Sequence, residues 1–233
     1  GQYLDAKMID SIAAANYKYD QVGIFAENEW RLRPDLALTV GVRHDNHSIF
    51  GGATTPRAYL VWNTSDNWTL KGGVSKGYRT PGLEQLFDGV TGYGRQGDPT
   101  RPIWGNPNLR PEKSTSTELA ALFDNLQGFR ANATIFNTDL KDAIGSETFT
   151  DINGIATASR VINVDNASVR GLELGSSWQF ARAWRLLANY TFTDSEQKTG
   201  PNKGQPLNNT SRHVFNAKVN WQTTADLNVW AQT

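Results

Sequence analysis

The residues best suited to hold a ligand lie in one long Gly/Pro-rich stretch, residues 77–114. Arginines offer charge-assisted hydrogen bonds, and tyrosine and tryptophan offer stacking and cation–π contacts. A bulky, anionic or aromatic ligand would suit this combination, although any single side chain could instead only hold the stretch folded. We expect ligand contacts from Arg79, Tyr93, Arg95, Arg101 and Trp104.

Other chemistry is poorly supported by the residue types. His44 and His47 flank Asp45 with the spacing of a weak metal motif, but a zinc or iron site would need a third convergent ligand. The sequence "GGVSKG" looks like a phosphate loop but alternates like a strand, and no nucleophile stands beside a histidine base. We therefore expect no catalysis, no metal site and no covalently bound cofactor.

The composition excludes several classes of protein. Lys+Arg and Asp+Glu are 23 each, so no single-sign field favours nucleic acid. The absence of cysteine excludes disulfides. Only 38% of residues are hydrophobic and the mean hydropathy is −0.52, so no stretch can form a transmembrane helix. Yet there are 8 Trp against 1 Met, which favours a sheet with one apolar and one wet face.

Period-two alternation is the dominant pattern along the chain. Between Trp184 and Thr193, for example, apolar and polar residues alternate at every position except Leu187. Many such runs approach the roughly 9–11 residues that a tilted strand needs to cross a bilayer. The predicted strands are 19–31, 36–45, 55–63, 68–79, 114–124, 129–144, 161–180, 184–194, 212–223 and 227 onward.

The connections between these runs alternate in length. Short turns fall at "RLRPD", "TSDN", "DNLQG", "ARA" and "TTAD", and long connections at 46–54, 80–113, 145–160 and 195–211. Short turns at one end and long loops at the other are the layout of outer-membrane barrels. The sequence thus predicts an all-β fold, an antiparallel transmembrane β-barrel of which about ten strands are present.

Seven tryptophans lie within a few residues of the short turns, and only Trp104 lies in a long loop. Packing in the core of a soluble sandwich would spread them along the strands instead. An indole is apolar but its N–H needs a partner, which suits a membrane–water interface. We expect a membrane-interface girdle of Trp30, Trp62, Trp68, Trp178, Trp184, Trp221 and Trp230.

Several stretches together resemble the TonB-dependent outer-membrane receptors, in particular the ferric-siderophore and colicin receptor group. They are "FAENEWRL", "LTVGVRHDNHSIFG", "TTPRAYLVWNTSDNWTLKGGVSKGYRTPGLEQLF", "GNPNLRPEKSTSTELA" and "VINVDNASVRGLELGSSWQF". The resemblance implies a barrel of about 22 strands that is plugged by an N-terminal domain. We expect residues 1–233 to be part of that barrel, with the plug domain, its TonB box and the C-terminal strand outside this sequence.

The resemblance also implies a function. The family binds a ferric siderophore at extracellular loops in the Gram-negative outer membrane, among outer-membrane lipid, and imports it with energy from the TonB complex through the plug. The series "GYRTP…GYGRQG…GNPNL" favours catecholate siderophores. Haem, cobalamin and glycan remain alternative ligands, a passive porin-type barrel remains an alternative function, and colicins or phages are further partners that the family suggests.

Both ends of the long stretch read as anchors. Pro107 and Pro111 fix the backbone before a strand, and Glu112 is expected to pair with an arginine of a neighbouring strand. At the other end we expect a small hydrophobic cluster of Leu83, Leu86 and Phe87. Residues facing a lumen would line a guide path, contact the plug or simply be solvated: Arg43, Arg57, Arg130, Glu118, Glu173 and Lys218.

Overall fold

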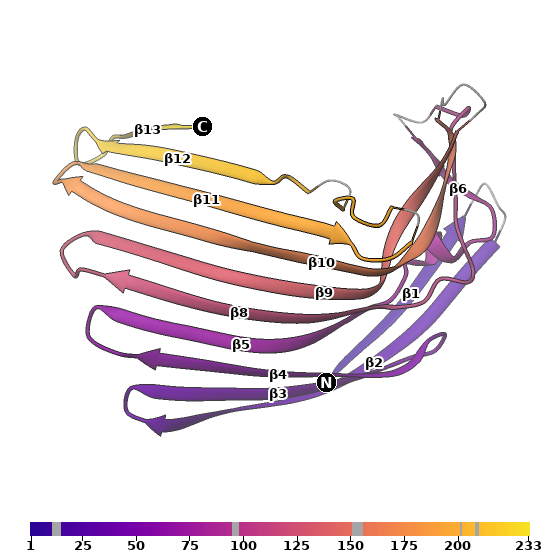
Figure 1. Cartoon of the computed structure of the whole chain (residues 1–233), viewed down its shortest axis with the longest axis horizontal. Helices are drawn as coiled ribbons and strands as arrows, with labels where there is room; N and C mark the ends of the chain where they lie inside the picture. The colour runs from indigo at the N-terminus through magenta and orange to yellow at the C-terminus, as the bar shows by residue number, and fades with distance from the viewer. Residues whose placement is uncertain (11–14, 95–97, 151–155, 201, 208–209) are drawn as a thin grey trace.

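The computed structural model describes residues 1–10, 15–94, 98–150, 156–200, 202–207 and 210–233. Eleven strands form one continuous curved sheet in the order β1-β2-β3-β4-β5-β8-β9-β10-β11-β12-β13 (Figure 1). Each strand pairs antiparallel with its neighbour along this path. The strands are β1 (Gln2–Asp10), β2 (Ala15–Arg33), β3 (Leu36–His47), β4 (Gly51–Asn63), β5 (Trp68–Arg79), β8 (Glu112–Asp124), β9 (Phe129–Thr150), β10 (Ala156–Ala181), β11 (Trp184–Gln197), β12 (His213–Gln222) and β13 (Asn228–Gln232).

The remaining elements belong to the long connection between β5 and β8. A 3-10 helix, η1 (Leu83–Leu86), is followed by two short strands, β6 (Val90–Tyr93) and β7 (Pro102–Trp104). β6 pairs with β7, and β7 also pairs in parallel with the outer part of β10. Among the described residues, no helix is long and apolar enough to cross a membrane.

The predicted antiparallel meander is confirmed, but several of its elements differ from the prediction. Residues 48–50 alone join β3 to β4, where a long connection at 46–54 was expected. β1 was not predicted, although Leu4 and Ala6 alternate with Asp5 and Lys7 in its sequence. The expected long connection at 145–160 is instead largely strand, with β9 and β10 running to 22 and 26 residues. These extensions lie beyond the apolar part of the sheet, where no lipid imposes an alternation of apolar and polar residues. Their sequences therefore lack the pattern from which strands were predicted.

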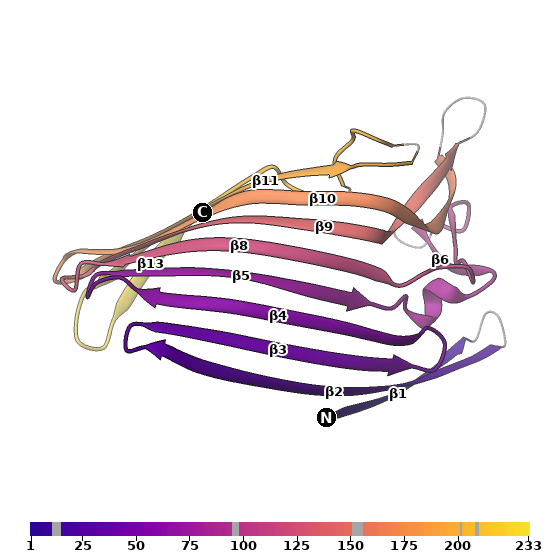
Figure 2. The same cartoon turned by 60° about the horizontal axis from the view of Figure 1, so that its bottom comes forward.

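The short turns gather at one end of the sheet and the long connections at the other (Figure 2). We call these the short-turn end and the long-loop end. In the turn between β8 and β9, Leu126 and Gly128 adopt positive φ angles of 59° and 102°. The side chain of Asn125 caps this turn by accepting the N–H groups of Gln127 and Phe129, both at 2.8 Å.

The register divides the sheet into an apolar face and a polar face. Directly paired residues share a face, and the face alternates at each residue along a strand. Ile24, Val42, Leu119, Ile135 and Phe215 lie on the apolar face, and each remains between 47% and 63% exposed. A sheet this exposed on its apolar side is covered by something other than this chain, and a bilayer provides that cover.

Six of the seven expected girdle tryptophans occupy the apolar face near the short turns. Trp62 donates its indole N–H to Asp35 at 2.9 Å, and the rings of Trp184 and Trp221 stack with their centroids 5.1 Å apart. Trp230 differs, because Trp221 pairs with Val229, which puts Trp230 on the polar face, where it pairs with Asn220. The ammonium of Lys218 lies 4.6 Å from the Trp230 ring.

Candidate functional site

The long connection is closed at its base by an ion pair. Arg79 ends β5 and Glu112 begins β8, and the two are direct partners in the ladder. The guanidinium donates from Nη2 to Oε2 at 2.9 Å and from Nε to Oε1 at 3.3 Å. Glu112 Oε2 also accepts the Ile144 N–H at 3.0 Å. The expectation that Glu112 pairs with an arginine of a neighbouring strand is confirmed, and that arginine is Arg79.

A second fastening joins the end of the connection to β9 and β10. The Asn163 side chain accepts the Arg110 N–H at 2.8 Å and donates to the carbonyls of Arg110 and Asp142 at 2.9 and 2.8 Å. The Arg110 guanidinium also reaches the Asp142 carboxylate at 2.7 Å. Asp142 has a positive φ of 55°, a conformation that costs energy in a non-glycine residue. These bonds hold that conformation in place.

A small buried core lies beneath the connection. Leu83 is 6% exposed and Leu109 is 3% exposed, which is rare on this open sheet. η1 begins where Gln85 Oε1 accepts the Gly82 N–H at 2.9 Å. Gly105 must be glycine, because a Cβ there would lie 2.3 Å from the Phe87 carbonyl oxygen. Of the predicted cluster, Leu83 is buried, while Leu86 and Phe87 are only half-buried.

The β6–β7 ribbon carries three of the predicted ligand residues. Tyr93 pairs with Pro102 across the ribbon, and Trp104 pairs with Val90. Their side chains are 39% and 44% exposed, so their rings are available for stacking. Arg101 lies next to this ribbon, with its Nε 3.7 Å from Asp98 Oδ2.

The other two predicted ligand residues are placed differently. Arg79 lies at the base of the connection, where Glu112 occupies its guanidinium. Arg95 falls outside the described residues.

One exposed arginine near the ribbon was missed by the sequence reasoning. Arg160 is the register partner of Trp104 where β7 runs parallel to β10. Its side chain is exposed, and it adds a second cation beside Arg101 at this end. The sequence predicts a connection at 145–160, so nothing in it places Arg160 beside Trp104, and only the strand pairing brings the two segments together.

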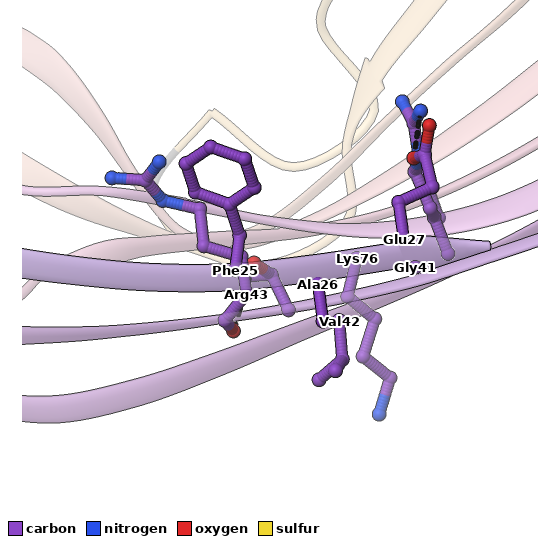
Figure 3. Close-up of a pocket in the computed structure, with 10 residues that line it drawn as sticks. Phe25, Ala26, Glu27, Gly41, Val42, Arg43 and Lys76 are labelled. Atoms are coloured by element: carbon purple, nitrogen blue, oxygen red, sulfur yellow. Dashed lines mark hydrogen bonds and ion pairs between the residues drawn. The ribbon is translucent and has the colours of Figure 1, made fainter. Parts of the chain in front are cut away.

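A pocket lies near the middle of β2, β3 and β4, and its charged polar-face residues are Glu27, Arg43 and Arg57 (Figure 3). The Arg43 guanidinium lies 6.0 Å from the Phe25 ring centroid and binds both oxygens of Asp45 at 2.6 Å. Glu27 and Arg57 form an ion pair alongside. The register places all six expected lumen residues on this polar face: Arg43, Arg57, Arg130, Glu118, Glu173 and Lys218.

The two histidines of "RHDNH" lie on opposite faces of β3. His44 contacts Thr54 Oγ1 at 2.9 Å on the apolar face. His47 is only 1% exposed on the polar face, between Tyr19 at 4.3 Å and Phe50 at 5.0 Å between ring centroids. Its Nδ1 accepts the Ile49 N–H at 3.1 Å, and burial lowers the pKa of the ring, which lies beyond the apolar band at the long-loop end. The described residues contain no group of three His, Cys, Asp or Glu side chains able to hold a metal ion.

Known proteins with similar sequences include an iron-regulated outer-membrane protein and ferric enterobactin receptors. The iron-regulated outer membrane virulence protein of Vibrio cholerae is 38% identical over 217 residues, which cover 89% of this chain and 32% of that protein. The ferric enterobactin receptor of Pseudomonas aeruginosa is 30% identical, over 89% of this chain and 29% of that protein. This chain spans about a third of the length of these relatives.

Solved structures share the fold. The siderophore receptor PirA of Pseudomonas aeruginosa superposes with a TM-score of 0.78 at 22% identity, over 99% of this chain and 40% of that one. A structure of the ferric enterobactin receptor of the same organism with bound enterobactin gives 0.72 at 28% identity, over 93% of this chain and 32% of that one.

The family model described as "TonB dependent receptor-like, beta-barrel" matches residues 3–232, nearly the whole chain. The exposed apolar face, the aromatic residues near the short turns and the open antiparallel sheet fit a part of such a barrel in the outer membrane. The chain therefore belongs to the TonB-dependent receptors, as a segment of their outer-membrane β-barrel.

Proposed function

We propose that the complete receptor binds a ferric siderophore at its long-loop end and imports it with energy delivered by TonB. The observation that carries the proposal is the β6–β7 ribbon, which presents Tyr93, Trp104 and Arg101 above a fastened base. Aromatic faces and guanidinium groups match an anionic chelate built from aromatic rings.

Within this class, we favour a catecholate chelate. Such a ligand is aromatic, strongly anionic and too large for one side chain to enclose, so several exposed residues must share it. Arg160 and Arg101 would supply charge at one side, and the rings of Tyr93 and Trp104 would supply stacking. Three of the relatives are named for ferric enterobactin or ferrienterobactin, which supports this choice.

The later steps need parts of the protein outside this chain. The polar face, with its alternating arginines and carboxylates, would surround the plug and guide a polar ligand past it. Several of its charges are already paired, as in Arg43 with Asp45 and Arg57 with Glu27. Paired charges along this face offer a ligand many weak contacts and no single tight binding site, which suits the passage of the ligand through the barrel.

Growth on iron chelates tests this function directly. The complete gene is deleted in its host, and growth under iron limitation is measured with a panel of ferric catecholates, ferric hydroxamates and haem. We expect growth on at least one ferric catecholate to be lost and to return with the intact gene, while an uncoupler of the proton gradient blocks uptake but leaves surface binding. Unchanged uptake of every chelate tried would overturn the proposal.

A further inference from the structure

Three lysines form a cluster on the apolar face at the long-loop end. Lys113 and Lys141 are direct partners across β8 and β9, and Lys76 on β5 pairs with Thr115, which puts Lys76 diagonally beside Lys113. Like charges placed directly opposite one another on a sheet repel. All three side chains are exposed, and none forms an ion pair with any residue that the structure describes.

The position of the cluster relative to the lipid follows from the register. On β5 the apolar face reads Trp68, Leu70, Gly72 and Val74 before it reaches Lys76. Figure 3 shows Lys76 projecting to the same side as Val42, opposite to Phe25, Arg43 and Glu27. The lysines therefore stand on the membrane side of the wall, just beyond its apolar band and at the height of lipid headgroups.

Several other charges on this face beyond the band are paired within the chain. Arg170 pairs with Asp194 at 2.8 Å, and Lys18 lies 3.6 Å from Asp5 and 3.7 Å from Asp20. The lysine cluster has one nearby acid, Asp139, whose Oδ2 accepts the Asn137 side-chain N–H at 3.0 Å. Three lysines beside one acid thus leave an excess of positive charge at this place.

A groove runs beside the cluster. β4 and β5 are paired only from Arg57 and Ser75 toward the short turns, although β4 begins at Gly51 and β5 continues to Arg79. The two strands separate beyond that point, as Figure 2 shows at the long-loop end. The groove in this region is lined by Thr54, Lys76, Tyr78, Lys113, Asp139 and Lys141, among others.

We propose that this groove binds the phosphorylated headgroup of an outer-leaflet lipid. Three ammonium groups from three adjacent strands match a phosphate in charge, and their site at headgroup height allows the acyl chains to rest on the apolar band below. Basic pockets at a membrane surface recognise lipid phosphates in this way. The inference depends on the outer-membrane location of the barrel and is independent of which ligand the receptor imports.

Lipid binding to the purified full-length receptor tests the site. Native mass spectrometry in detergent would compare bis-phosphorylated lipid A with the same lipid after removal of its phosphates. We expect the K76Q/K113Q/K141Q variant to bind the phosphorylated lipid about thirtyfold more weakly than the wild type, since each lysine near the surface contributes to the attraction. The matched control is K71Q, which changes a lysine on the polar face of the same strand.

A second variant should change the lipid affinity in the opposite direction. Asp139 is the one acid among the described residues that line the groove, so D139N should strengthen binding of the phosphorylated lipid. If the triple variant does not fold, each single Lys→Gln variant should still weaken binding by roughly threefold. Equal binding by wild type and lysine variants, equal binding of the dephosphorylated lipid, or full displacement by millimolar inorganic phosphate would each overturn the proposal.

Discussion

Arg79 and Glu112 face one another across the β5–β8 ladder and hold the two ends of the longest external connection together. The carboxylate accepts two hydrogen bonds from the guanidinium and a third from the Ile144 N–H. Three strands, β5, β8 and β9, meet at the Glu112 side chain. The β6–β7 ribbon above, for which we propose ligand binding, therefore depends on Glu112 for a fixed base.

Replacing Glu112 by alanine should therefore release the connection and leave the barrel intact. Loss of a charge-assisted pair and of the acceptor for Ile144 should lower local stability by about 1.5–3 kcal/mol. Limited proteolysis of the full-length receptor should then cut faster within residues 83–111. E84A, which removes an exposed acid of η1, is the control. Equal cutting of E112A and wild type would show that the ion pair does not hold the base.

Asn163 should matter as much as the ion pair, although it carries no charge. Its amide makes three hydrogen bonds, to Arg110 twice and to the Asp142 carbonyl. Asn163→Leu keeps the volume but leaves these backbone groups unpaired, at a cost of about 1–3 kcal/mol for each one that stays buried. Hydrogen exchange of the Arg110 amide should accelerate, whereas N216L, which changes an exposed asparagine of β12, should leave it unchanged.

The turn after β3 should open in acid. Because burial lowers the pKa of His47, the open form of the turn binds a proton more readily than the closed form. The stabilising effect of the neutral ring is thus complete above the ordinary histidine value of about 6.5 and is lost as the pH falls below it. A proton on Nδ1 also removes the acceptor of the Ile49 N–H.

Hydrogen exchange at Ile49, corrected for the intrinsic pH dependence, measures this opening. Protection should fall between about pH 6.5 and pH 5 in the wild type and should not depend on pH in H47Q. Constant protection of the wild-type amide across that range would contradict the assignment of the buried ring as the cause.

The stacked pair of Trp184 and Trp221 should be coupled energetically at the membrane interface. A double-mutant cycle with alanine, measured by denaturant unfolding from lipid vesicles, should give about 0.5–1.5 kcal/mol of interaction. Trp230 lies on the other face, so W184A and W230A should be additive. A zero coupling for the stacked pair would mean that lipid replaces the lost ring contact completely.

The sheet could be predicted from the sequence wherever a bilayer imposes its pattern. Lipid on one side and water on the other force the alternation seen from Leu36 to Val42 and from Trp184 to Phe192, so these strands were placed within a few residues. The outer parts of β9 and β10 have no lipid neighbour and no alternation. Their pairing became visible only in the structure.

Only part of the candidate site could be predicted from the sequence, because contacts between neighbouring strands are local in the ladder and the other contacts are not. Glu112 was expected to pair because a carboxylate at a strand entry has neighbours in the ladder, but its partner Arg79 had been assigned to the ligand. Arg160 was missed because its contact with Trp104 joins segments far apart in the sequence. Trp230 was expected in the girdle because it lies near a short turn. Distance from a turn does not tell which face of the sheet a side chain occupies, because the face alternates with every residue along a strand.

The most direct test of the account is a titration of the purified full-length receptor with ferric chelates, followed by tryptophan fluorescence. We predict saturable binding of a ferric tris-catecholate that weakens by about tenfold or more when Tyr93, Arg101 and Trp104 are replaced together by alanine, as expected for the loss of several stacking and charge-assisted contacts. The control variant R130A changes an arginine near the short turns and should bind normally. Binding of haem or cobalamin in place of every ferric siderophore, or unchanged affinity in the triple variant, would contradict the account.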